Sequence, residues 1–173
     1  MSLRVFRTSG SNERSVHTER FSPPHCRLSG SCRKRVAIQR FGDVDAAGIA
    51  YFPRIYGYLH EVFEDLWESH VGVRYYHLLL ERRMGFPLAH SEVDFRSPLR
   101  FGDRPVVRVT SFRLGRSSLG LRYRFHVGDR ECVDARMTVV CVDTQTMQSQ
   151  PMPEEFRRRF EEIQEPLEKG ESS

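Results

Sequence analysis

The chain of 173 residues lacks any apolar run approaching the roughly 20 residues of a bilayer-spanning helix, so we expect no membrane partner. It has only four cysteines, and none of them forms a C-x-x-C pair or a zinc-ligand spacing. The glycine fingerprints of P-loop and Rossmann nucleotide sites are missing. So are a G-x-S-x-G nucleophile elbow and a helical H-E-x-x-H zinc motif. We therefore expect neither a metal ion nor a redox cofactor.

Excess positive charge is confined to the first 40 residues. Residues 1–40 hold nine Lys and Arg against two acidic residues, whereas residues 41–173 hold 18 against 21. A nucleic-acid-binding domain needs basic residues clustered on its folded part, so we expect no nucleic-acid partner. Residues 1–33 are rich in Ser, Arg, Pro and Gly without a hydrophobic period, which predicts a basic, disordered leader. This composition also fits an organellar transit peptide, the alternative to a cytoplasmic location.

The sequence does contain a stretch of clear helical periodicity. Ile55, Leu59, Val62 and Leu66 belong to an apolar face that recurs every three to four residues, and Pro53 falls in the first turn. This pattern predicts one long amphipathic helix from Pro53 to about residue 70. We expect a loop of small residues and two aspartates before it, over residues 42–50, and a strand over residues 34–41.

A long stretch of period two follows the helices. Residues 87–141 alternate between apolar and polar side chains, which is typical of antiparallel strands with one buried face. We expect four strands there, a shorter helix over residues 75–83 before them and a charged surface helix over residues 153–164 after them. The long helix is the only element suited to cover the apolar sheet face. The predicted fold class is therefore α+β, an antiparallel sheet of about five strands wrapped around one long central helix.

Two segments resemble a known family. The segment "RFGDVDAAGIAYFPRIYGYLHEVFEDLW", residues 40–67, resembles the start of the 4-hydroxybenzoyl-CoA thioesterase family, and residues 95–125 resemble that family's paired central strands. The resemblance implies a hotdog fold over residues 34–153, with residues 154–173 forming a C-terminal helix and tail. It also implies an acyl-CoA thioesterase whose coenzyme A is part of the substrate.

Two alternatives to that assignment stay open. The wording "DAAGIAYF" also resembles 1,4-dihydroxy-2-naphthoyl-CoA hydrolases. A non-catalytic hotdog protein that binds acyl-CoA or an acyl carrier is the other alternative. In the 4-hydroxybenzoyl enzyme an acidic residue stands where this chain has His60, which argues against that particular acyl group. An aromatic acyl group of another kind remains the expectation.

The loop before the long helix offers the chemistry that thioester hydrolysis needs. Gly48 lets the backbone approach a ligand closely, and the first turn of the helix, from Tyr51, offers free N–H groups that favour developing negative charge. A thioester carbonyl bound there is polarised by the Phe52 N–H while a carboxylate attacks it or activates water. The resemblance implies that Asp45 is this carboxylate, as nucleophile or general base, whereas loop capping accounts for Asp43 equally well.

The substrate-binding residues and the assembly are the last predictions. Arg116, Ser117 and Ser118 lie where the family carries basic and hydroxyl residues that hold coenzyme A phosphates, and a solvated hairpin tip explains them equally well. We place Tyr51 at the acyl pocket, with His90 and Glu92 as further candidates for its lining. A single sheet exposes an edge, so we expect a homodimer or homotetramer with the site between subunits.

Overall fold

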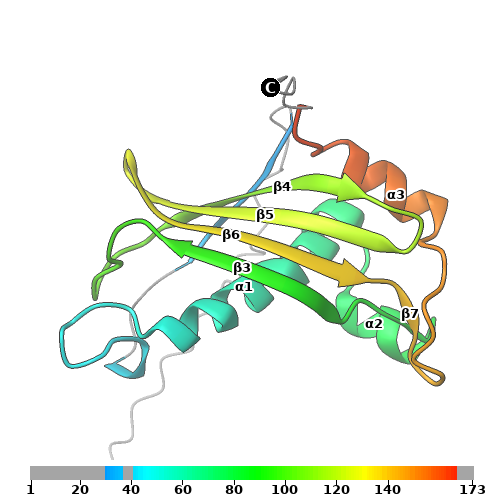
Figure 1. The fold of residues 1–173 in the computed structure, drawn as a ribbon, viewed down its shortest axis with the longest axis horizontal. Coiled ribbons are helices and arrows are strands. Elements are labelled where there is room, and N and C mark those ends of the chain that lie inside the picture. The colour runs from blue at the N-terminus through cyan, green and yellow to red at the C-terminus, as the bar shows by residue number, and fades with distance from the viewer. Residues whose placement is uncertain (1–29, 37–40, 167–173) are drawn as a thin grey trace, which may run out of the picture.

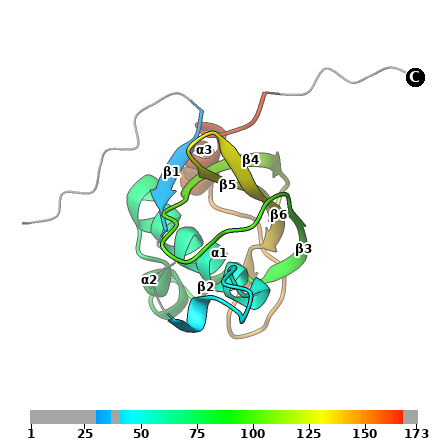
Figure 2. The ribbon, with the colours of Figure 1, turned by 90° about the vertical axis from the view of Figure 1, so that its left-hand side faces the viewer.

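The computed structural model describes residues 30–36 and 41–166, so most of the expected leader lies outside the described residues. Five antiparallel strands form one sheet in the order β1-β4-β5-β6-β3 (Figure 1). Their bounds are β1 Cys32–Arg35, β4 Val106–Leu114, β5 Ser118–Val127, β6 Arg130–Val140 and β3 Leu88–Phe95. The sheet curves around α1 (Phe52–Leu66), which the π-helical turn η2 (Trp67–Val71) extends (Figure 2). The predicted α+β architecture is confirmed.

Alternation along the strands explains why the sheet closes on this helix. On β5, Leu119, Leu121 and Phe125 are fully buried and face α1, whereas Arg122 and Arg124 between them point to the outer surface. The apolar face of α1 packs against these strand residues, and its members are also buried: Ile55, Tyr58, Leu59, Val62, Phe63 and Leu66. The helical segment ends at Gly72, whose φ of 87° places it in the left-handed region that favours glycine.

Two boundaries differ from the predictions. The first strand starts two residues earlier than expected and ends at Arg35, because its partner β4 is preceded by Pro105. Pro105 accepts a hydrogen bond from the Val36 N–H but has no N–H to return, so the ladder stops there. The short helix α2 (Tyr75–Leu80) ends three residues before the expected boundary because Arg83 has a φ of 51°, outside the helical region.

The described fold also contains a second, small sheet and a 3-10 turn. β2 (Met84–Gly85) and β7 (Val142–Asp143) pair as a two-stranded sheet, and the 3-10 turn η1 (Phe41–Asp43) stands where the end of the first strand was expected. No helix in the described part of the chain is long and apolar enough to cross a membrane.

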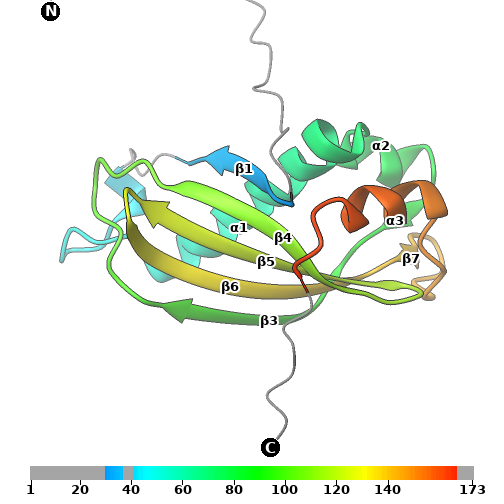
Figure 3. The same ribbon diagram turned by 90° about the horizontal axis from the view of Figure 1, so that it is seen from above.

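The C-terminal helix α3 (Glu154–Glu161) is more than the charged surface helix predicted from its sequence. Its two phenylalanines, Phe156 and Phe160, are buried and pack edge-on against Trp67, with ring centroids 5.2 and 5.3 Å away. Figure 3 shows α3 lying alongside the end of β4. The phenylalanines are four residues apart, so they share one helix face and belong to the core.

Candidate active site

The loop between η1 and α1 is a small, firmly held hairpin. Val44 and Ala50 form an antiparallel bridge, and the Ala50 N–H donates to the Leu99 carbonyl at 2.7 Å. At the tip, the Gly48 N–H donates to the Asp45 carbonyl at 3.0 Å, and Gly48 has a φ of 73°. That conformation favours glycine and lets the chain turn tightly at Gly48, within the loop expected over residues 42–50. The backbone alone therefore holds the loop against the segment that precedes β4.

Asp43 fastens this loop to the helix. Its side chain is only 2% exposed, and its Oδ1 accepts hydrogen bonds from Arg54 Nε at 3.1 Å and Arg54 Nη2 at 2.9 Å. Burial, together with the neighbouring Asp43 carboxylate, raises the pKa of Tyr58 to about 12. Asp43 also accepts the Tyr51 N–H on its backbone carbonyl at 2.8 Å. These contacts assign Asp43 a structural role, the loop-capping alternative for this residue.

Asp45 has the opposite environment. Its side chain is exposed at the loop tip, and its Oδ1 accepts the Ala47 N–H at 2.8 Å. That hydrogen bond closes an Asx turn and orients the carboxylate without burying it. A solvent-facing carboxylate on a rigid loop is free to reach a bound substrate or water.

The start of α1 lies directly after this loop. Phe52 and Tyr51 are 61% and 46% exposed, and no side chain caps the helix at Tyr51. Phe52 is the first residue of the helix, so its N–H has no acceptor within the helix, and Pro53 has no N–H at all. An uncapped helix N-terminus that follows a loop with an oriented carboxylate is able to bind a polarised carbonyl oxygen.

The predicted phosphate-binding residues lie elsewhere in the chain. Arg116 and Ser117 form the tip of the hairpin between β4 and β5, and Ser118 begins β5. The backbone carbonyls of Arg116 and Ser117 accept the N–H groups of Met152 and Cys141 at 2.9 and 2.7 Å, while the Arg116 side chain is exposed. In Figure 1 this hairpin and the loop before α1 lie at opposite ends of the sheet. One chain does not bring the two groups together.

Two other sequence candidates, His90 and Glu92, are placed differently from the expectation. Glu92 and His90 lie on the outer face of β3, turned away from α1, because they alternate with inward-facing residues such as Ser91. The inward polar contact is instead made by Ser91, whose Oγ is 3.4 Å from the Tyr56 hydroxyl. His60 is exposed on α1 and lies 3.3 Å from the Glu64 carboxylate.

The residues missed by sequence reasoning are Arg54 and the charged cluster on the outer sheet face. Arg54 is not part of the apolar face of the helix that the sequence indicated, and its guanidinium holds the buried Asp43. On the outer face, Arg122 donates two hydrogen bonds to Asp134, at 2.8 and 2.7 Å. Strand alternation signalled the outward direction of these residues, but their cross-strand partners depend on register, which periodicity does not specify. In the described part of the chain, no three His, Cys, Asp or Glu side chains are grouped closely enough to hold a metal ion.

Comparison with known proteins identifies a family for this chain. Residues 39–160 match the Thioesterase-like superfamily. A 1,4-dihydroxy-2-naphthoyl-CoA hydrolase from Synechococcus elongatus is 30% identical over 121 residues, covering 69% of this chain and 88% of the relative. A crystal structure of a 1,4-dihydroxy-2-naphthoyl-CoA thioesterase from Synechocystis superposes with a TM-score of 0.69 at 22% identity, covering 79% of this chain and all of that one. A gentisyl-coenzyme A thioesterase superposes with a TM-score of 0.63 at 26% identity, covering 73% and 98%.

Proposed function

The chain belongs to the Thioesterase-like superfamily and is an acyl-CoA thioesterase, and we propose that it hydrolyses an aromatic acyl-CoA with Asp45 as its catalytic carboxylate. The observation that carries this proposal is the pairing of an exposed, oriented carboxylate with an uncapped helix N-terminus on one rigid loop. Asp43 is unsuited to the role, because Arg54 occupies its buried carboxylate.

The chemistry follows from these two groups. The thioester oxygen accepts the Phe52 N–H, which stabilises the negative charge that develops when the carbonyl carbon is attacked. As a general base, Asp45 takes a proton from the attacking water. As a nucleophile, it forms a mixed anhydride that water then hydrolyses. In either route the carbon–sulfur bond breaks, the free acid is released, and the coenzyme A thiolate leaves and takes up a proton.

The relatives support an aromatic acyl group. The Synechococcus relative and the Synechocystis structure are named for a 1,4-dihydroxy-2-naphthoyl thioester, and the third protein for a gentisyl thioester. All three names describe hydroxylated aromatic acids. We therefore place the bicyclic naphthoyl group ahead of the 4-hydroxybenzoyl group, in keeping with the exposed imidazole of His60 at the position where the hydroxybenzoyl enzyme has an acid.

The site is proposed to form between two copies of the chain. Strand β3 is an edge of the sheet, and it carries two exposed apolar side chains, Leu88 and Phe95, at 50% and 55%. A two-fold axis beside this edge pairs β3 with β3 of the partner subunit in antiparallel fashion. The partner's five-stranded sheet then runs in the opposite direction, so that opposite ends of the two sheets lie on the same side of the dimer. The partner's hairpin at Arg116–Ser118 then lies at the same end as Asp45. A homodimer thus unites two groups that a single chain keeps apart.

The test is coenzyme A release from 1,4-dihydroxy-2-naphthoyl-CoA, 4-hydroxybenzoyl-CoA and an aliphatic acyl-CoA. We expect the wild-type protein to prefer the aromatic thioesters and Asp45→Asn to lose at least about 100-fold in kcat. Asp129→Asn, which changes an exposed turn aspartate on the β5–β6 hairpin, is the matched control and keeps wild-type turnover. An Asp45→Asn protein that retains full turnover would remove Asp45 from the mechanism, and a preference for the aliphatic thioester would refute the aromatic assignment.

A further inference from the structure

The outer face of the sheet carries an aromatic ring in an unusual setting. A register shift between Ser111 and Arg113 makes Phe112 an extra, unpaired residue on β4, beside the pair that Arg113 forms with Gly120 of β5. The Phe112 ring lies over this glycine so closely that a Cβ atom at Gly120 would come within 2.7 Å of it. Phe112 is half-buried on the face of the sheet that points away from α1. Glycine thus makes room for a ring whose other side faces outward.

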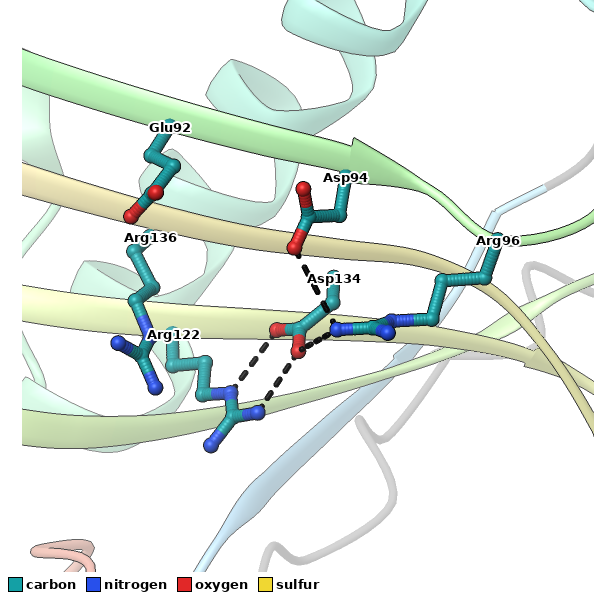
Figure 4. Close-up of a pocket in the computed structure, with 6 residues that line it drawn as sticks. All are labelled: Glu92, Asp94, Arg96, Arg122, Asp134 and Arg136. Carbon is teal, nitrogen blue, oxygen red and sulfur yellow. Dashed lines mark hydrogen bonds and ion pairs between the residues drawn. The ribbon is translucent and has the colours of Figure 1, made fainter.

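An arginine accompanies this ring. The Arg136 guanidinium carbon lies 5.9 Å from the centroid of the Phe112 ring. Glu92 is the direct cross-strand neighbour of Arg136, yet Figure 4 shows the Arg136 side chain extending away from Glu92 and toward Arg122. Among the residues that the structure describes, no carboxylate oxygen forms an ion pair with Arg136. The exposed guanidinium therefore keeps its donors available.

In the hollow beside Arg136 most of the other charged side chains are joined in ion pairs, whereas Glu92 forms none with the described residues. The lining of this hollow is Glu92, Asp94, Arg96, Arg122, Asp134 and Arg136 (Figure 4). Asp134 is bound by both Arg122 and Arg96, and Arg122 also lies 3.7 Å from Glu165. Of the three lining arginines, Arg136 is the one that forms no ion pair with the described residues, and the likewise unpaired Glu92 is its neighbour on β3. An aromatic ring beside a free guanidinium is the combination that binds a nucleotide, through base stacking and a phosphate contact.

We propose that Phe112 and Arg136 bind the adenosine phosphate end of the acyl-CoA substrate. Adenine stacks on the outward face of Phe112, and the long, exposed Arg136 side chain swings over the base and reaches a phosphate. The hairpin at Arg116–Ser118 follows directly after β4. The Phe112 ring, proposed to stack on adenine, is therefore close in the chain to the hairpin residues that are proposed to bind the coenzyme A phosphates. This inference rests on the proposed function and adds to it the residues that recognise the nucleotide.

The direct test is the binding of adenosine 3′,5′-bisphosphate to the full chain, measured by isothermal titration calorimetry. We expect Phe112→Leu and Arg136→Gln each to weaken binding about tenfold. Arg108→Gln is the matched control. Like Arg136 on β6, Arg108 on β4 is an exposed arginine of the outer sheet face that makes no ion pair with described residues. Wild-type affinity in both test variants, or no binding by the wild-type protein, would overturn the inference. This assay does not depend on turnover, so it separates failure of the inference from failure of the proposed function.

A kinetic comparison separates nucleotide recognition from a merely structural role. The same acyl group is offered as its coenzyme A thioester and as its N-acetylcysteamine thioester, which has no nucleotide. In both variants we expect the KM for the coenzyme A thioester to rise about tenfold, so that the ratio of the two kcat/KM values falls by the same factor. An equal loss with both thioesters indicates a packing role for Phe112 and Arg136 and contradicts the inference.

Discussion

Two aspartates that stand two residues apart have unlike environments. Asp43 is buried under Arg54, whereas Asp45 is exposed and held only by a turn hydrogen bond. The difference arises because Asp43 precedes the loop where the chain still packs on α1, and Asp45 lies at the loop tip. Substitution of Asp43 should therefore lower the stability of the fold, whereas substitution of Asp45 should lower turnover and leave stability unchanged.

For Asp43→Asn we expect the free energy of unfolding to fall by about 1–3 kcal/mol, because a buried acceptor loses its charge while its donors stay in place. Urea denaturation followed by circular dichroism measures the loss. Asp45→Asn is the internal control, with unfolding within about 0.5 kcal/mol of wild type because the side chain is exposed. Equal stability of all three proteins would contradict the anchoring role of Asp43.

Asp134 should make stability depend on acid pH. The two hydrogen bonds from Arg122 lower the pKa of this carboxyl below its usual range. A carboxyl whose pKa is depressed in the folded state stabilises the fold above its unfolded pKa of about 3.9, and this contribution is lost as the pH falls further. We therefore expect Asp134→Asn to be less stable than wild type at pH 7, and the difference to shrink at pH 3.

Urea unfolding of both proteins at pH 7 and pH 3 tests this dependence. Asp94→Asn is the control, since Asp94 faces Asp134 on the neighbouring strand but is exposed. A stability difference between wild type and Asp134→Asn that stays the same at both pH values would show that the carboxylate charge is not the source.

Among the secondary-structure elements, α3 contributes to the core although its sequence is mostly charged. Its eight residues are not all surface groups, because Phe156 and Phe160 contact the single tryptophan of the chain. Trp67 also packs on Phe86 of the segment before β3, with ring centroids 4.7 Å apart. The helix therefore closes the core at the end of the sheet.

Phe160→Ala should lower the free energy of unfolding by about 3–5 kcal/mol, since it removes a fully buried ring and leaves a cavity. The single tryptophan reports the change directly, and we expect its emission to shift to longer wavelength as water reaches Trp67. Phe101→Ala is the control for ring loss at an exposed position. A Phe160→Ala protein as stable as that control would show that α3 does not support the core.

The complete molecule raises the question of assembly, because the loop with Asp45 and the hairpin with Arg116 lie at opposite ends of the sheet. The proposed two-fold pairing at β3 depends on the exposed apolar residues of that edge. In a Leu88→Asp, Phe95→Asp double variant, charges along the edge should prevent pairing. We expect the wild-type protein to be at least dimeric and the variant to be monomeric and without acyl-CoA turnover.

Multi-angle light scattering together with the coenzyme A release assay checks this expectation. Met147→Asp places the same charge on an exposed apolar residue in the turn after β7 and should leave the oligomer intact. A monomeric wild-type protein with full turnover would show that one chain suffices for the reaction.

Local sequence patterns were enough to predict most of the helices and strands of this protein. Helical periodicity identified α1 from Ile55 onward, and strand alternation placed β3 to β6 and the buried faces of β4 to β6, because burial of one face imposes a period on the residues that form it. The predicted loop over residues 42–50 rests on the same kind of local evidence, since the left-handed φ found at Gly48 favours one residue type. The assignment of Asp45 as the catalytic carboxylate came from family resemblance and stays a prediction.

Contacts between distant segments could not be read in this way. The capture of Asp43 by Arg54, the burial of Phe160 against Trp67 and the placement of Phe112 over Gly120 depend on register and packing. No local period encodes them, because each joins residues whose separation in the chain is unrelated to their separation in space. The same reason explains why the loop before α1, which carries Asp45, and the β4–β5 hairpin, which carries Arg116, lie at opposite ends of the sheet (Figure 1).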